Sequence, residues 1–381
     1  INRDSYYGGG QDPNAYGNTT DLNWMAGSQY VYSFGKCIFM PADLTAGIEF
    51  NQDKLEDNMW GYNRTVDQKV NIGSAFLQNE WKNEHWGFLI GGRLDKHNLI
   101  DHVIFSPRAN LRYNPTENIN LRFSYSSGFR APQAFDEDLH VENVGGNVAM
   151  VELADNLKEE RSQSLSASAD IYHRFGAFQV NFLVEGFYTK LSDVFALTDG
   201  EVVDGILTRT RYNAPGARVM GLTLEGKMAY LTKFQVQAGV TLQQSHYSEP
   251  HVWNKEAPAV KKMMRTPNTY GYFTATYTPI KPLSIALSGT YTGSMLVPHE
   301  PVPGFLEKPI TVNTKDFFDI GLKAAYDFKL YKSMNLQVNA GVQNIFNAYQ
   351  NDFDKGADRD SGYIYGPSLP RSFFAGVKIS Y

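Results

Sequence analysis

Carboxylate side chains recur at about every second position of the segment 352–360, around Gly356. These carboxylates belong to Asp352, Asp354, Asp358 and Asp360. Oxygen-rich loops with this spacing can wrap Ca²⁺. The segment lacks the bidentate Glu of an EF-hand, however, and Lys355 and Arg359 can neutralise its charge. Two interpretations therefore stay open, a calcium-binding loop and a solvated acidic loop.

Imidazole, indole and thioether side chains form a second set of candidate binding residues. The set comprises His246, His251, Trp253, Met263, Met264, Met295 and His299. Aromatic and Met side chains suit ligand surfaces because they bury a large area with adaptable contacts. These residues are therefore candidates for a binding vestibule in long loops. The alternative is that they pack the loops against one another, and the sequence does not separate the two interpretations.

The sequence contains no motif that indicates catalysis. It has no Gly-rich phosphate loop, no nucleophile elbow and no zinc-binding helix with paired histidines. Its many carboxylates fit a polar lumen, so we expect no enzyme. The net charge of −5 and the lack of a Lys/Arg stripe with stacking aromatics give no reason to expect nucleic acid. The single cysteine, Cys37, rules out a scaffold built on disulfides.

Alternation of apolar and polar residues with period two is the dominant pattern from end to end. Leu44, Ala46, Ile48 and Phe50, for example, alternate with Thr45, Gly47, Glu49 and Asn51. There are about fifteen such segments, most of them long against a usual strand of about 5–6 residues. They cover 24–34, 43–53, 69–81, 86–97, 104–113, 119–127, 162–175, 177–193, 208–231, 234–247, 268–278, 283–296, 315–328, 334–347 and 371–381. The ninth contains a bend or bulge at 213–216.

Short and long connections alternate between these segments. The short turns are 82–85, 114–118, 231–233, 279–282 and 329–333, and the long polar loops are 128–161, 194–207, 248–267, 297–314 and 347–370. This pattern is typical of outer-membrane barrels, which have short periplasmic turns and long extracellular loops. Aromatic residues near segment ends favour interfacial girdles: Trp81, Trp86, Tyr113, Tyr125, Tyr188, Tyr230, Tyr277 and Tyr326. No apolar run reaches the roughly 18 residues of a helical span.

The parity of the strands predicts that part of the barrel is missing from this chain. Tyr381 ends the last segment on the short-turn side, so an odd strand number places residue 1 on the long-loop side. A complete single-chain bacterial barrel has an even strand number. An open sheet edge cannot lie in lipid, because its backbone groups would have no hydrogen-bond partners. We therefore expect an N-terminal portion that this chain does not contain.

Several stretches resemble the barrel of the TonB-dependent receptor family, in the family's order, from about residue 70 to the end. They are Ala75-Phe76-Leu77-Gln78-Asn79-Glu80-Trp81, Gly91-Gly92-Arg93-Leu94-Asp95, Ser106-Pro107-Arg108-Ala109, Leu157-Lys158-Glu159-Glu160-Arg161-Ser162, Asn213 with Gly221-Leu222-Thr223-Leu224-Glu225-Gly226, Asn344-Ile345-Phe346-Asn347, Tyr365-Gly366-Pro367, and Pro370-Arg371 with the terminal Tyr381. Phe129, Arg130, Ala131 and Pro132 look like the family's FRAP box, in which Arg130 is expected to be a structural anchor.

The resemblance implies a transmembrane antiparallel β-barrel in which residues 1–381 supply the C-terminal strands, about 15 of 22. The N-terminal plug and early strands would then be absent from this chain. Haem receptors of the family carry a histidine between the FRAP box and an Asn-Pro-Asn/Asp-Leu box. His140 lies in that interval, but the second box reads Ala154-Asp155-Asn156-Leu157, without the proline. The alternative for His140 is a solvated loop residue.

Active uptake of a scarce, bulky nutrient across the bacterial outer membrane is the function that the resemblance implies. The nutrient class is a metal chelate, namely a siderophore, haem or a corrinoid. The implied partners are outer-membrane lipid, the missing N-terminal portion, the TonB complex and a surface lipoprotein. The alternatives are a TonB-dependent glycan or peptide importer, a passive porin, and a soluble β-rich lectin or hydrolase. The odd strand count argues against a porin, and the alternating loop lengths argue against a soluble protein.

Overall fold

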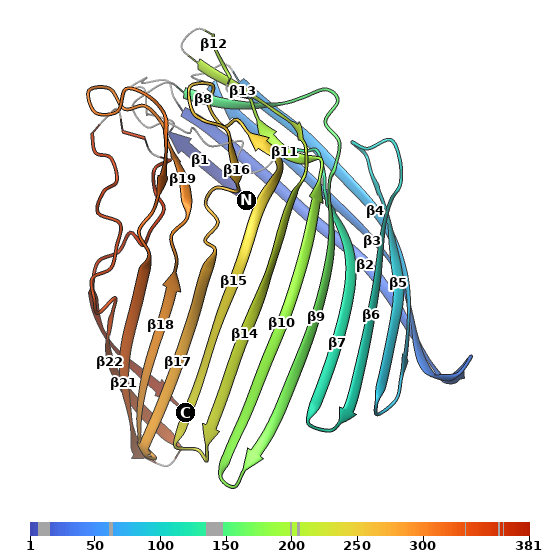
Figure 1. The fold of residues 1–381 in the computed structure, drawn as a ribbon, viewed down its shortest axis with the longest axis vertical. Coiled ribbons are helices and arrows are strands. Elements are labelled where there is room, and N and C mark those ends of the chain that lie inside the picture. The colour runs from blue at the N-terminus through green and yellow to red at the C-terminus, as the bar shows by residue number, and fades with distance from the viewer. Residues whose placement is uncertain are drawn as a thin grey trace.

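The computed structural model describes residues 1–6, 16–60, 64–134, 148–198, 200–203, 206–331, 333–356, 359–360 and 362–381. The regular elements in this part of the chain are β-strands (Figure 1). Seventeen of them form one sheet, which curves into a barrel wall. Among the residues described, no helix is long and apolar enough to cross a membrane.

Fifteen long strands of this sheet follow one another along the chain, and each pairs antiparallel with the next. They are β2 (Tyr16–Cys37), β3 (Met40–Met59), β4 (Arg64–Lys82), β5 (Trp86–His97), β6 (Ile104–Thr116), β7 (Ile119–Arg130), β9 (Glu160–Phe175), β10 (Phe178–Ser192), β14 (Ala217–Tyr230), β15 (Phe234–His251), β17 (Thr269–Ile280), β18 (Leu283–Thr292), β21 (Phe317–Tyr331), β22 (Met334–Gln343) and β23 (Ser372–Ser380). Short β1 (Asn2–Tyr6) pairs with the start of β2, and short β16 (Val260–Lys262) pairs with the end of β15. The predicted all-β barrel wall and its strand count are confirmed.

Two small sheets lie on the long-loop side, at the top of Figure 1. One contains β8 (Val148–Leu153), β11 (Val194–Leu197), β12 (Glu201–Val203) and β13 (Ile206–Ala214), and the other pairs β19 (Leu296–His299) with β20 (Ile310–Asn313). The segment 208–231 is therefore not one continuous strand but is divided between β13 and β14, and the division falls at 213–216, where the sequence predicts a bend or bulge. Pro215 has no N–H for a strand ladder, and a Cβ at Gly216 would clash with the carbonyl oxygen of Leu191.

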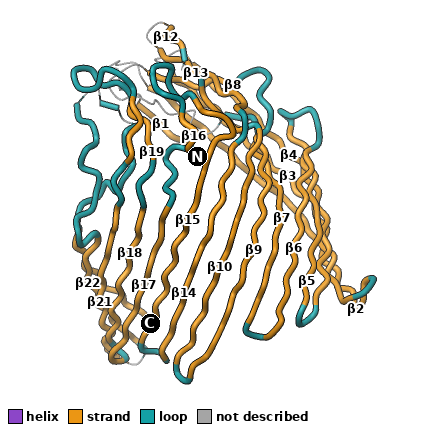
Figure 2. The backbone as a smooth tube through the Cα atoms, in the orientation of Figure 1, coloured by secondary structure: helices purple, strands orange, loops and turns teal. Residues whose placement is uncertain are grey.

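Connections of unequal length lie at the two ends of the wall, as the sequence predicts (Figure 2). Tight turns join β9 to β10 and β14 to β15, with Gly176 at φ 59° and Leu231 at φ 48°. The long loops gather at the opposite end. Most of the fully buried side chains also lie in the long-loop half, because the loops cover the wall there: Met59, Ile104, His97, Val70, Val297, Asp57 and Ser245.

The alternation of residues along each strand gives the wall an apolar outward face and a polar inward face. Phe182 and Tyr188 of β10, for example, expose 47% and 39% of their surface outward. On the inward face, Lys227 forms an ion pair with Glu225 at 2.7 Å, and Tyr272 donates a hydrogen bond to Glu225 from two strands away. Large apolar side chains that point away from the wall's own polar network are what a lipid-facing band requires.

An aromatic row marks the short-turn end of this band. Strand register places its members directly opposite one another on neighbouring strands: Phe175, Phe178, Tyr230, Phe234 and Tyr277. On earlier strands, the rings of Trp86 and Tyr113 stack with centroids 4.2 Å apart. The register thus supports the predicted interfacial girdle at this end of the strands.

The edges of the wall are formed by β23 on one side and by β1 with β2 on the other. Within the residues that the structure describes, β23 pairs only with β22. Free edges of this kind are compatible with further strands completing the barrel, since backbone groups in lipid must be paired. That completion by an N-terminal portion stays a prediction.

Candidate ligand-binding site

The loop between β18 and β21 and the loop between β22 and β23 are joined by His299 on the long-loop side. His299 is 5% exposed, and its Nε2 lies 2.9 Å from Asp354 Oδ2. Its imidazole stacks on the Tyr363 ring with centroids 3.8 Å apart and an interplanar angle of 6°. Met295 and Val297 complete the buried cluster around Tyr363. Two loops that are separate in sequence therefore pack as one unit.

Tyr365 and Gln350 order the second of these loops. The Tyr365 hydroxyl donates to both carboxylate oxygens of Asp352, at 2.7 and 2.6 Å. Burial and the neighbouring Asp352 carboxylate raise the pKa of the Tyr365 phenol far above its ordinary value, so it stays a neutral donor. The Gln350 side chain donates to Tyr363 O at 3.0 Å and accepts from Tyr365 N at 2.8 Å. Both tyrosines are thereby held in place.

The loop between β15 and β17 is tied to the same cluster. Arg265 Nη1 donates to Ile364 O at 2.9 Å. Asn254 Nδ2 donates to Glu300 Oε2 at 2.9 Å, next to His299. Three loops therefore form one contiguous surface above the barrel wall, which we call the loop cluster.

The acidic segment 352–360 takes part in the loop cluster, but its described carboxylates do not converge on one point. Asp352 binds Tyr365, and Asp354 binds His299. Asp360 accepts the N–H of Glu300 at 2.9 Å through Oδ2. No group of three or more metal-ligating side chains is found in the described part of the chain, and Asp358 lies outside it. The expected calcium site stays a prediction.

His246 and His251 are strand residues of β15 and not loop residues as expected for the binding set; His246 falls within the predicted strand segment 234–247, whereas His251 lies beyond it. β15 continues to His251 because it pairs with β16 beyond the point where the alternation fades. His246 lies opposite Arg218 and Lys262, on the outward face of the wall. The His251 ring lies 4.8 Å from the Tyr247 ring, centroid to centroid.

The other expected binding residues, Trp253, His299 and His140, do not lie together in one described site. Trp253 follows β15 in the loop, adjacent to Asn254, and its indole Nε1 is buried with no hydrogen-bond partner among the described residues. His299 lies at the centre of the loop cluster, whereas His140 lies outside the described residues. Sequence reasoning missed Gln350 and Tyr363. In the sequence, the two tyrosines spaced two apart in the segment 362–366, Tyr363 and Tyr365, were the signal that could have pointed to this part of the loop.

The FRAP-like residues lie where β7 ends on the long-loop side. Arg130 lies over the Phe195 ring of β11 at 5.6 Å, and Arg211 of β13 lies 5.9 Å from the same ring. Ala131 is 8% exposed. Phe195 thus packs against two guanidinium groups, and Arg130 joins the end of β7 to the small sheet.

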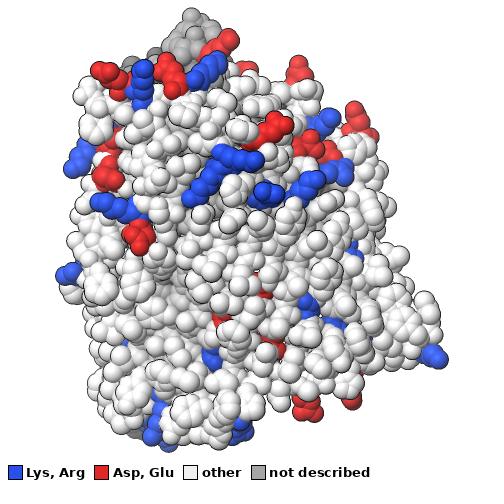
Figure 3. Space-filling view, viewed as in Figure 1, with Lys and Arg blue, Asp and Glu red and all other residues white. Residues whose placement is uncertain are grey.

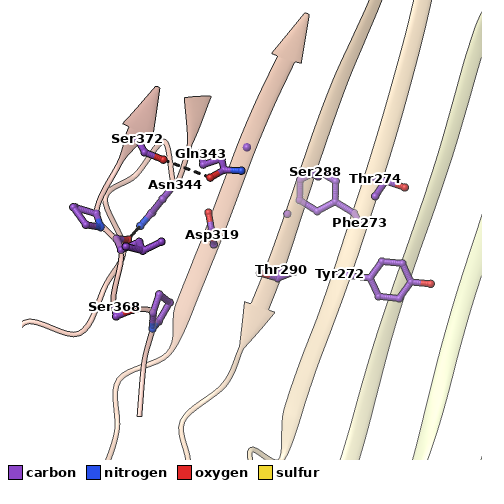
Figure 4. A pocket seen from close by; sticks show the side chains of 15 residues that line it. Tyr272, Phe273, Thr274, Ser288, Thr290, Asp319, Gln343, Asn344, Ser368 and Ser372 are labelled. Carbon is purple, nitrogen blue, oxygen red and sulfur yellow. Dashed lines mark hydrogen bonds between the residues drawn. The ribbon is translucent and has the colours of Figure 1, made fainter. Parts of the chain in front are cut away.

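A cavity of about 600 Å³ lies on the inward face beneath the loop cluster (Figure 4). Its walls come from β17, β18, β21, β22 and β23 and from the returning end of the β22–β23 loop: Tyr272, Phe273, Thr274, Ser288, Gly289, Thr290, Asp319, Gly321, Gln343, Asn344, Pro367, Ser368, Leu369, Pro370 and Ser372. Among these described lining residues, Asp319 is the one charged side chain. Gln350 N donates to Pro367 O at 3.0 Å, so the loop cluster and the cavity share a segment.

An apolar outward face, a polar inward face and unequal loops define an outer-membrane β-barrel. A family model described as "TonB dependent receptor-like, beta-barrel" matches residues 1–345, and the chain belongs to this family. The sequence stretches that resemble the family begin at about residue 70, whereas the family model already matches from residue 1. The model ends at residue 345, before Tyr365-Gly366-Pro367 and Pro370-Arg371. The family consists of receptor barrels rather than enzymes, so no catalytic activity is assigned. The barrel is located in the bacterial outer membrane.

Solved structures of similar fold include a ferric enterobactin receptor, a siderophore receptor and an iron transporter. The ferric enterobactin receptor PfeA of Pseudomonas aeruginosa has a TM-score of 0.67 and 18% identity over 96% of this chain and 55% of that one. The siderophore receptor PirA of Acinetobacter baumannii has a TM-score of 0.66 and 16% identity over 95% and 55%. The FrpB iron transporter of Neisseria meningitidis has a TM-score of 0.67 and 16% identity over 99% and 58%. The chain spans little more than half of each. No curated protein sequence matches it.

Proposed function

We propose that this protein takes up a metal chelate across the outer membrane, with energy supplied through the TonB complex of the inner membrane. The observation that carries the proposal is the family match over residues 1–345. The likeness in fold to siderophore and iron receptors supports the substrate class. A glycan or peptide importer and a passive porin are the alternatives that the experiment below separates.

The cavity beneath the loop cluster suits a bulky polar ligand. Its volume of about 600 Å³ lies in the range of small-molecule sites. Hydroxyl and amide groups such as Ser288, Thr290 and Gln343 can orient a ligand by hydrogen bonds, and Tyr272 can cover an aromatic group. We infer that the loop cluster captures the chelate and passes it to this cavity. Because the second haem-type box lacks its proline, we favour a siderophore over haem.

Further partners follow from the same proposal. An N-terminal portion with the plug would close the lumen, and force from TonB would displace the plug. A surface lipoprotein could deliver the ligand to the loop cluster. Each of these partners is a proposal for the whole receptor and not a property of the part described above.

The test uses the protein purified from outer membranes. Quenching of Trp fluorescence would measure binding of a ferric catecholate siderophore, haem, cyanocobalamin and a maltooligosaccharide, and iron uptake would be measured in cells with and without TonB. We expect tightest binding of the ferric siderophore and uptake that needs TonB. Uptake that is equal without TonB would indicate a passive pore, and binding of the oligosaccharide alone would indicate a glycan importer.

A steric variant links this function to the cavity. Ser288→Trp places a large side chain into the cavity lining, and we expect roughly tenfold weaker ligand binding. Ser284→Trp is the matched control, because Ser284 points to the same face of β18 but does not line the cavity. Equal affinities of the two variants would place the binding site elsewhere.

A further inference from the structure

Four basic side chains lie side by side on the outward face of neighbouring strands. Lys190 of β10 is opposite Arg218 of β14, Arg218 is opposite His246 of β15, and His246 is opposite Lys262 of β16. We call these four residues the basic row. Lys190 and Arg218 are exposed, and the other two are half-buried. In Figure 3, Lys and Arg side chains gather in a band across the upper part of this face.

The positive charges of the basic row have no anionic partner among the described residues of the chain. Like charges directly opposite one another in a sheet are destabilising, yet Lys190 and Arg218 occupy such a pair. Lys190, Arg218 and Lys262 form no ion pair with a described residue, and within the same part of the chain His246 Nδ1 is buried without a hydrogen-bond partner. Glu159, at the nearby start of β9, is already bound by Arg161. An anion from outside the chain would therefore relieve the repulsion.

The basic row lies directly above the apolar band. On β10, the outward residues between the aromatic row and Lys190 are Val180, Phe182, Val184, Gly186 and Tyr188. The 12 residue steps from Phe178 to Lys190 correspond to about 40 Å along a strand at about 3.3 Å per residue. With a strand tilt of about 40°, the height is about 30 Å, close to an apolar band of about 25 Å plus a headgroup layer. The row thus lies at headgroup level on the long-loop side.

We propose that the basic row binds phosphate groups carried by the headgroups of outer-leaflet lipids, whose acyl chains cover the apolar residues below it. Arg binds phosphate through a planar fork of donors and Lys binds it as a point charge, so Lys190 and Arg218 can share one phosphate group. The continuous apolar surface beneath favours a lipid over a free phosphate ion. The same charges would fix the height of the barrel in the membrane.

Native mass spectrometry tests this proposal with the protein purified from outer membranes. The probes are diphosphorylated lipid A and dephosphorylated lipid A, each in phosphatidylcholine nanodiscs, and the readout is the lipid A retained after a detergent wash. We expect retention of the diphosphorylated lipid alone. The double variant K190Q/R218Q should retain about thirtyfold less, since it removes two cations and each cation near an anionic surface contributes about 1 kcal/mol.

Two further variants keep the test decisive. K233Q/K281Q removes the same charge from the short turns between β14 and β15 and between β17 and β18, and it should retain lipid A as the wild type does. K190R/R218K keeps both charges and should restore retention if the glutamine variant folds poorly. Equal retention of both lipids, or full retention by a folded K190Q/R218Q, would overturn the proposal. Complete displacement by inorganic phosphate would assign the row to free anions instead.

Discussion

His299 Nε2 lies 2.9 Å from Asp354 Oδ2, and both side chains are only 6% exposed. This contact joins β19 to the loop between β22 and β23. Asp354 also accepts the N–H of Asp360 at 3.2 Å. A hydrogen bond that involves a charged group contributes about 1.5–3 kcal/mol when its partner would otherwise be left buried alone. The pair is therefore a charge-assisted, buried connection between these two loops.

Replacing Asp354 by Asn should release the loop cluster without unfolding the barrel. We expect trypsin to cleave after Lys355 or Arg359 roughly tenfold faster, because the loop opens more often. Limited proteolysis followed by mass spectrometry measures the rate, and Glu307→Gln, in an exposed part of the β18–β21 loop, is the control. Unchanged cleavage in Asp354→Asn would mean that the His299 contact does not hold the loop.

Acidification should loosen the start of β9 through Glu159. Burial of this carboxyl opposes its ionisation, but hydrogen bonds from Arg161 and His102 outweigh the burial and hold the pKa of Glu159 below its ordinary value of 4.5. A carboxyl whose pKa is lower in the folded state stabilises the fold above the unfolded-state pKa, and this stability is lost as the pH falls through the folded-state pKa. The relevant window therefore lies below pH 4.5.

Hydrogen exchange of the segment 154–161 would detect this change. We expect its amides to exchange faster as the pH falls below about 4.5, after correction for the intrinsic exchange rate. Glu159→Gln should exchange rapidly at every pH and lose the transition. A transition that persists in Glu159→Gln would assign it to another group.

Arg93 holds two inward carboxylates of the wall together. Its Nη2 lies 2.8 Å from Glu49 Oε1 and its Nε lies 2.8 Å from Asp95 Oδ1, and Asp95 is 2% exposed. Arg93→Met should lower the free energy of unfolding by about 2 kcal/mol, because both carboxylates lose a charged donor. The urea dependence of the heat-modifiable gel shift measures the loss. Arg108→Met, an exposed inward arginine of β6 with no ion pair among the described residues, should cost less than about 0.5 kcal/mol.

Adjacent residues of β10 should tolerate an arginine very differently. Val184 faces outward midway between the aromatic row and the basic row, whereas Leu183 faces inward, opposite Asp170 and Glu225. Val184→Arg should destabilise the barrel by about 2–4 kcal/mol, as expected for a cation at the middle of the bilayer. Leu183→Arg should be close to neutral. Comparing the urea midpoints of the two variants in one lipid tests the assignment of the faces, and a larger loss in Leu183→Arg would reverse it.

The sequence by itself determined the kind of wall that this chain forms. Period-two alternation is a local property of a strand with one lipid-facing side, so segments such as 86–97 and 104–113 were located to within a few residues. The alternation of loop lengths depends only on strand order, which is why the two ends of the wall could be told apart. The transmembrane β-barrel of the family was predictable for these reasons.

Tertiary structure decided where the loops pack and which residues meet there. His299 and Asp354 are 55 positions apart, and the contact depends on two irregular loops that have no periodicity to read. The strand position of His251 depends on β15 continuing beside β16, and the division between β13 and β14 depends on β13 pairing with a different sheet. Local pattern fixes which face of a strand a residue occupies, but only the three-dimensional packing of distant segments fixes its neighbours.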